Sequence, residues 1–197
     1  MGYKHSREEI LDAALGVAHE HGISNLSFGR VAARLGINDR TVVYYFPSKA
    51  DLVGEVLLVL GARLQVLLEG AFGPDPRPVA DLLADAWKAL ATAEADPTFA
   101  AFFEVTGLAS AGVDPYPEVA AGLVAAWRDW LVPRTAVAPG GDRTGAALGL
   151  IAQLDGLLLL RQVAGPAAAD AAARALGVVG GPRRRRPGAT GVRRGPG

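Results

Sequence analysis

The sequence predicts an all-α protein in which an N-terminal three-helix head is joined to a larger helical bundle that carries a dimerisation interface. Apolar residues recur at helical spacing along most of the chain, and helix-capping residues precede several of these stretches. Runs that alternate β-branched and polar residues, which would indicate strands, are missing. Clusters of glycine and proline separate the helical stretches and mark their boundaries.

The first predicted helix opens the head. Ser6 and Glu9 form a capping box, in which each side chain accepts a hydrogen bond from the backbone N–H of the other residue. Apolar residues from Ile10 to Ala18 follow at helical spacing, and Gly22 ends the pattern. This spacing predicts a helix with one buried face.

Two shorter helices complete the head. Ser27 is the expected N-cap of the second helix, and Gly36 closes it. Asn38 is expected to cap a third helix over residues 39–46. Pro47 stops this helix because its ring disfavours helical backbone at the preceding residue.

The spacing of small and apolar residues in these two helices fits a helix-turn-helix. Ala32 is small where the helices would cross closely, and Gly36, four residues later, allows the positive φ of the turn. Ile37 and Val42 are expected to fill the wedge between the helices, and Phe46 is expected to belong to the core.

The rest of the chain is predicted to form a helical body. A second capping box, Ser48 to Asp51, opens a long helix that continues through Leu67. The stretch 73–78 is a linker or turn by composition. Further helices, separated by breaks that contain proline, are expected near residues 79–95, 98–111, 116–131, 142–164 and 167–177.

Charge is distributed unevenly over three expected parts: a head over 1–48, a body over 49–179 and a tail over 180–197. The net charge is zero, but residues 51–179 hold 8 basic and 15 acidic side chains. Such a body would be repelled by nucleic acid. The tail holds six Arg and no acid among Gly and Pro, and is predicted to be disordered; an auxiliary nucleic-acid arm is the alternative.

Several classes of protein are excluded by composition. The chain has no Cys, so it has neither a disulfide framework nor a Cys-based zinc site, and a reducing cytoplasm fits this. The N-terminus lacks the apolar segment of a secretory signal. The most apolar run, 146–160, is shorter than the roughly 20 residues of a membrane span, so we interpret it as a buried helix and expect no membrane contact.

The head resembles the DNA-binding domain of the TetR (tetracycline repressor-like) family. Residues 36–49 resemble the core of that family, and the wider stretch 7–57 resembles its whole DNA-binding domain. The chain departs from the family at Val43, where a phosphate-contacting Tyr is usual, and at Ala18, where an aromatic residue is usual. The resemblance is carried by Ile10, Leu11, Ala13, Ala14, Gly22, Ser27, Val31, Ala32, Phe46, Ser48, Lys49 and Leu52.

The resemblance implies that the third helix enters the major groove of DNA. Arg40 is suited to bridge guanine O6 and N7, and Asp39 to accept from cytosine N4. Tyr hydroxyls and helix N-termini are suited to phosphates. The expected DNA contacts are Ser27, Arg30, Asn38, Asp39, Arg40, Thr41, Tyr44, Tyr45 and Lys49.

Simpler interpretations of these residues remain open. Tyr44 and Tyr45 can simply pack against the head, Asp39 can act only as a capping acid, and Arg30 and Arg34 can be solvated charges on a helix face.

Residues 141–164 are apolar on nearly every face of the expected helix, so they must be covered all round. Contact with a second subunit would cover them, and the resemblance implies a homodimer through the helices near 142–164 and 167–177. The alternative is a central helix in a monomeric bundle.

Aromatic residues of the body suggest a pocket for a small-molecule effector, although an aromatic stripe is also typical of plain core. The body shows no basic cluster for phosphates, so an apolar or weakly polar ligand is expected. Glu104 and Tyr116 lie among these aromatics as polar groups, and the residues expected to bind the ligand are Trp87, Phe99, Phe102, Phe103, Thr106, Trp127 and Gln153.

The sequence therefore predicts a transcription regulator, a repressor that binds a palindromic operator on double-stranded DNA as a homodimer and is released by a ligand. Enzymatic activity, a metal site and a cofactor are not expected, because no catalytic or nucleotide-binding motif occurs and His19 and His21 do not share a helix face. The alternative is a helical ligand-binding or protein-interaction module without sequence-specific DNA binding.

Overall fold

The computed structural model describes residues 5–179, and the predicted disordered tail at 180–197 lies outside them. The described residues are helical apart from their connections and one isolated bridge between Arg77 and Thr135, which confirms the all-α prediction. The helices are α1 (Arg7–His21), α2 (Phe28–Leu35), α3 (Asp39–Tyr45), α4 (Lys49–Phe72), α5 (Val79–Leu90), α6 (Asp96–Ser110), α7 (Tyr116–Leu131), the 3-10 turn η1 (Val132–Arg134), α8 (Arg143–Ala164) and α9 (Pro166–Ala175).

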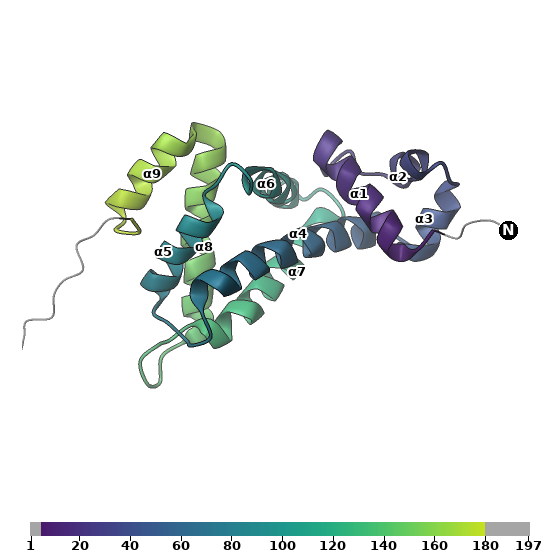
Figure 1. Cartoon of the computed structure of the whole chain (residues 1–197). Helices are drawn as coiled ribbons and strands as arrows, with labels where there is room; N and C mark the ends of the chain where they lie inside the picture. Colours follow the sequence, from purple (N-terminus) through teal and green to yellow (C-terminus); the bar gives the residue numbers. More distant parts are fainter. Residues whose placement is uncertain (1–4, 180–197) are drawn as a thin grey trace, which may run out of the picture.

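The molecule is elongated, with α1 to α3 at one end and α5, α8 and α9 at the other (Figure 1). Helix α4 runs from the head into the body, where α6 and α7 also pack (Figure 1). Two apolar clusters form the core. The cluster under the head includes Val105 of α6 and Tyr116 of α7, so the head packs on the body rather than hanging from α4 alone.

The expected helix starts are confirmed by their hydrogen bonds. Ser6 and Ser48 each form a capping box, with Glu9 and Asp51 as the third helical residue. Because these bonds satisfy backbone N–H groups that have no partner inside the helix, they determine where α1 and α4 begin.

The boundary between α5 and α6 differs from the prediction. Helix α5 ends at Leu90 instead of residue 95, and α6 begins at Asp96 instead of residue 98. The Thr92 hydroxyl accepts a hydrogen bond from the Ala95 backbone N–H at 3.3 Å, which stabilises a turn between the two helices. Pro97 lies in the first turn of α6, where a missing N–H costs nothing, so it opens a helix instead of separating two.

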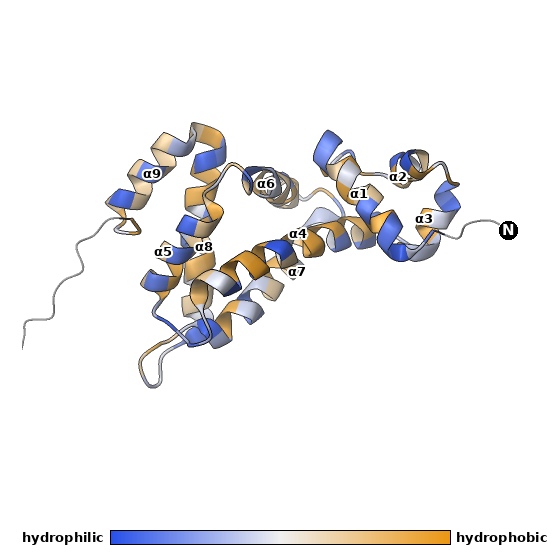
Figure 2. Ribbon diagram, viewed as in Figure 1, coloured by the Kyte–Doolittle hydropathy of each residue, from blue (hydrophilic) through white to orange (hydrophobic). Residues whose placement is uncertain are grey.

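Helix α8 is covered on only one side. It packs against α5, α6, α7 and α9 and buries Leu150, Leu157 and Leu158, whereas Leu159 and Val163 are 45% and 79% exposed. The prediction of a buried helix therefore holds for one face within a single chain. By length and composition α8 is apolar enough to cross a membrane, and it is orange over much of its length in Figure 2. The core helix of a soluble protein passes the same test of length and composition.

Candidate nucleic-acid interface and apolar cavity

The helix-turn-helix in the head has the predicted packing. Ala32 and Val42 are buried and Ile37 is half-buried between the two helices. Gly36 adopts the left-handed conformation at φ 65°, and its backbone N–H donates to Ala32 and Ala33 at the end of α2. A residue with a Cβ would be strained at this φ, so the glycine sets the angle at which α3 leaves the turn.

The outer side of α3 is available to a partner. Asp39 and Arg40 are exposed in its first turn, Tyr44 is 73% exposed, and Val43 lies beside it at 38%. Asn38 caps the helix by accepting from the Arg40 backbone N–H at 2.9 Å. The exposed side of α3 therefore combines a guanidinium, a carboxylate and a phenol, which can read base edges and phosphates.

The N-terminus of α2 belongs to the same helix-turn-helix. The Ser27 hydroxyl accepts from the Arg30 backbone N–H at 3.4 Å, and the Arg30 guanidinium donates to the Asn25 carbonyl at 3.1 Å. Both residues are exposed, and Thr41 of α3 is half-buried.

Tyr45 and Lys49, expected at phosphates, have hydrogen-bond partners within the chain. The Tyr45 hydroxyl donates to the His5 carbonyl at 3.1 Å, and its half-buried ring packs edge-on against Tyr44. The Lys49 ammonium donates to the Ser24 carbonyl at 3.2 Å and lies 5.6 Å from the centre of the Tyr116 ring. One residue thus ties α3 to the N-terminal segment, and the other ties the start of α4 to the loop before α2.

Ion pairs brace the head. The Arg34 guanidinium donates to both oxygens of Glu20, at 2.8 and 2.9 Å, and so joins α2 to α1. This pairing lowers the pKa of Glu20 below its usual value. Arg7 pairs with Glu55 of α4 at 2.7 Å and covers the buried Phe46 ring at 5.0 Å. Arg34 is therefore a brace between two helices and not merely a solvated charge.

A second feature, not anticipated from the sequence, joins the body to the head. Glu104 of α6 accepts hydrogen bonds from the backbone N–H groups of Ile23 at 2.8 Å and Ser24 at 2.9 Å, in the loop between α1 and α2. Burial alone would raise the pKa of Glu104. The bonds from Ser24 and Ile23 and the charge of Lys49 outweigh burial, so the pKa lies below its usual value.

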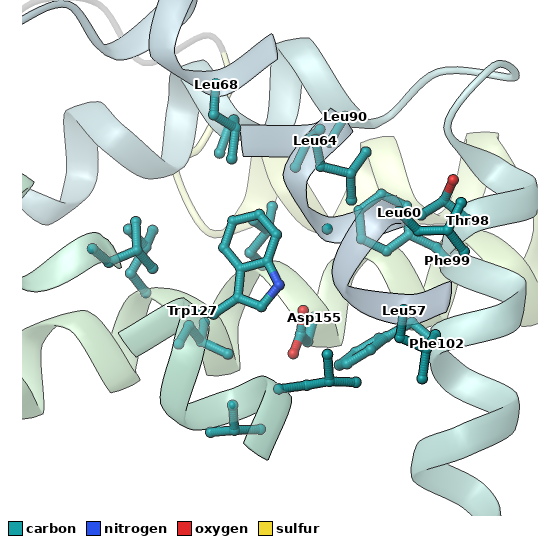
Figure 3. Close-up of a pocket in the computed structure, with 18 of the residues that line it drawn as sticks. Leu57, Leu60, Leu64, Leu68, Leu90, Thr98, Phe99, Phe102, Trp127 and Asp155 are labelled. Atoms are coloured by element: carbon teal, nitrogen blue, oxygen red, sulfur yellow. The ribbon is translucent and has the colours of Figure 1, made fainter. Parts of the chain in front are cut away.

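The body contains an apolar cavity of about 70 Å³ lined by residues of α4 to α8 (Figure 3). Of the residues expected to bind a ligand, Phe99, Phe102 and Trp127 line it. The other four do not: the cavity lining leaves out Trp87, Phe103, Thr106 and Gln153.

Three of these side chains lie on helix faces that are turned away from the cavity or have other partners. Trp87 is buried in the body core, and the Thr106 hydroxyl is bonded to the Phe103 carbonyl of its own helix. Gln153 is exposed, and its amide donates to the Gly149 carbonyl at 3.1 Å.

The polar groups of the cavity are Thr98 and Asp155, neither of which was expected there. The Asp155 carboxylate lies among the apolar side chains that surround the cavity (Figure 3), and burial raises its pKa to about 7. One feature of the sequence could have pointed to Asp155 as a cavity residue. It is the single carboxylate in the most apolar run of the chain, and it lies four positions from Ile151, on the same helical face. Among residues 5–179 no group of three or more His, Asp or Glu is placed to hold a metal ion.

Known proteins share both the head and the whole fold. Residues 10–56 match the sequence model of the bacterial regulatory proteins of the tetR family. No curated protein sequence matches the chain closely enough to count as a relative.

The solved structures that resemble the chain are helical regulators. One, assigned as a TetR-family transcriptional regulator from Rhodococcus sp., is 19% identical with a TM-score of 0.69, covering 88% of this chain and 97% of that one. SCO7518 of Streptomyces coelicolor A3(2), also assigned as a transcriptional regulator, is 25% identical with a TM-score of 0.63, covering 85% and 96%. The multidrug binding protein EbrR, complexed with proflavin, is 24% identical with a TM-score of 0.61, covering 87% and 97%.

The family model matches only the head, whereas the solved structures match the fold over nearly all of the described residues. The fold of this chain as a whole, head and body together, is thus that of solved transcriptional regulators. The head thus has the sequence signature of the tetR family of bacterial regulatory proteins, and the described residues share the fold of solved transcriptional regulators.

Proposed function

We propose that this regulator is a repressor that binds a palindromic operator as a homodimer and is released by a small, largely apolar ligand. The side chains proposed to contact DNA are those exposed on the head, with Arg40 and Asp39 at base edges and Tyr44 and Arg30 at phosphates. Tyr45 and Lys49 are assigned the internal contacts described above.

The homodimer is supported by the uncovered face of α8. Leu148, Leu159 and Val163 are exposed on it, and Leu176 after α9 is 65% exposed. Burying such a face against a second copy removes apolar surface from water at roughly 25 cal/mol per Å². A two-fold dimer would present two copies of α3, which suits a palindrome with half-sites about one helical turn apart.

The observation that carries ligand control is that α6 contributes to the cavity and also holds the head. Thr98, Phe99 and Phe102 line the cavity, and Glu104, less than one turn further on, accepts the bonds from Ile23 and Ser24. A cavity of about 70 Å³ is well below the roughly 300 Å³ of an ordinary ligand pocket. A ligand must therefore displace the cavity walls, and a shift of α6 would pull on the head.

The neighbour EbrR supports an effector of this kind, since that protein was solved with proflavin and with imidazole bound. In this chain the effector would act by favouring a separation of the two heads that no longer fits the operator.

Binding of the full chain to DNA from upstream of its own gene tests the proposal. Affinity should fall steeply with salt, as it does when Lys and Arg displace counterions from phosphates, and should fall again when the cavity is filled. Absent or salt-insensitive binding, with no enriched sites in a chromatin pull-down, would contradict it and favour a ligand-binding or protein-interaction module.

A further inference from the structure

The cavity in the body contains one charge-bearing group among the described residues that line it. Asp155 projects from α8, and its neighbours in the lining are aliphatic or aromatic apart from Thr98. No lysine, arginine or histidine lines this cavity to balance a carboxylate. The raised pKa of Asp155 has burial as its cause, which is the expected response of a carboxyl without a nearby cation.

Neither protonation state of Asp155 is well accommodated. An anion among apolar side chains lacks a counter-charge, and a neutral acid places an O–H donor where the walls offer few acceptors. A ligand with one positive charge would supply the counter-charge that the ionised Asp155 lacks. An anionic ligand would repel the ionised carboxylate.

The aromatic rings that line the cavity also favour a positively charged ligand. Trp127, Phe99 and Phe102 line the cavity, and the faces of such rings attract cations within about 6 Å. Gly61 of α4 lies against the Trp127 indole, since a Cβ at this position would be 3.7 Å from its Nε1. The aliphatic residues that remain would contact the apolar part of the ligand.

We propose that the effector is a compact lipophilic monocation, an ammonium or amidinium attached to an aromatic or branched alkyl group, whose charge pairs with Asp155 between Trp127 and Phe102. The inference rests on the proposed function and refines it by adding one positive charge to an apolar body. Since a cavity of about 150 Å³ is known to accommodate benzene, this one of about 70 Å³ must widen to take such a ring.

A matched pair of probes tests the charge on the full chain without DNA. Benzyltrimethylammonium and its neutral isostere neopentylbenzene have nearly the same shape, and Trp fluorescence reports binding because Trp127 lines the cavity. Asp155→Asn should weaken binding of the cation at least about tenfold and leave the neutral probe unchanged or tighter. Asp129→Asn is the control, since that carboxylate lies on the surface and pairs with Arg128.

Three results would overturn the inference: no binding of the cation, equal binding of both probes by the wild type, or equal affinity of the wild type and Asp155→Asn for the cation. The comparison of the probes on the wild type decides the matter even if the variant fails to fold. A separate arm adds the cation to the DNA complex. If the cation binds through Asp155 but DNA stays bound, ligand release is wrong and the charge assignment stands.

Discussion

Glu104 of α6 accepts a hydrogen bond from the Ser24 backbone N–H at 2.9 Å, across 80 positions of sequence. The loop that receives this carboxylate leads directly into the helix-turn-helix, while the same helix, α6, supplies Thr98, Phe99 and Phe102 to the cavity. Helix α6 therefore contacts both the cavity and the head. The contact gives the regulator a direct connection between the two.

Replacement of Glu104 should weaken this connection. In Glu104→Gln one of the two acceptor oxygens becomes an amide donor, so one backbone N–H loses its acceptor and the other keeps an uncharged one, and the free energy of unfolding should fall by about 1–2 kcal/mol. Ligand should then release DNA less completely. Chemical denaturation and DNA anisotropy measure the two effects, with the exposed Glu94→Gln as control. An unchanged response to ligand would refute a role for Glu104 in the coupling.

Arg40 should determine base preference. Arg40→Ala should cost about 1–3 kcal/mol of binding to the operator and much less to random DNA, because a guanidinium at a guanine edge carries specificity. Anisotropy titrations with both DNAs measure the difference. The exposed Arg63 of α4 provides the control, since Arg63→Ala removes the same charge away from α3. Equal losses on both DNAs would place Arg40 at phosphate.

The stability of the protein should depend on the ionisation of Asp155. Burial raises its pKa from 3.8 to about 7, so the folded state holds this proton more tightly than the unfolded chain does. The linked stability is present below about pH 4 and is lost as the pH rises through about 7.

Asp155→Asn removes this penalty, so its advantage over the wild type should grow from near zero at pH 4 to at least about 1 kcal/mol at pH 8. Thermal unfolding from pH 4 to pH 8 measures the gap, and Asp129→Asn serves as the surface control. A gap that does not change with pH would show that Asp155 ionises normally in the folded state.

The uncovered face of α8 should be required for dimerisation. Val163→Arg places a charge on this apolar face and should shift the protein toward monomers and weaken operator binding by at least about tenfold. Sedimentation velocity over a range of concentrations measures the association. Val66 on α4 is exposed to a similar extent, 68% against 79%, so Val66→Arg is a matched control. If only the control disrupts the dimer, the interface lies on α4.

Local sequence signals predicted the head well. Ser6, Ser27, Asn38 and Ser48 each cap the helix that follows, since a capping side chain bonds to backbone two or three residues away. Gly36 likewise has the positive φ that the turn needs. Because such contacts lie within a few residues, the sequence by itself determined the helices of the head and its likeness to the tetR family.

Only the tertiary structure decided which side chains meet across helices. Periodicity identifies an apolar face but not the rotation of that helix against its neighbours, so it included Gln153 in the pocket and overlooked Asp155 two positions away. Residues two positions apart on a helix point about 200° apart around its axis, so Gln153 faces solvent while Asp155 faces the cavity. The partners of Tyr45, Lys49 and Glu104 were set by packing between segments 25 to 81 positions apart, where no local rule applies.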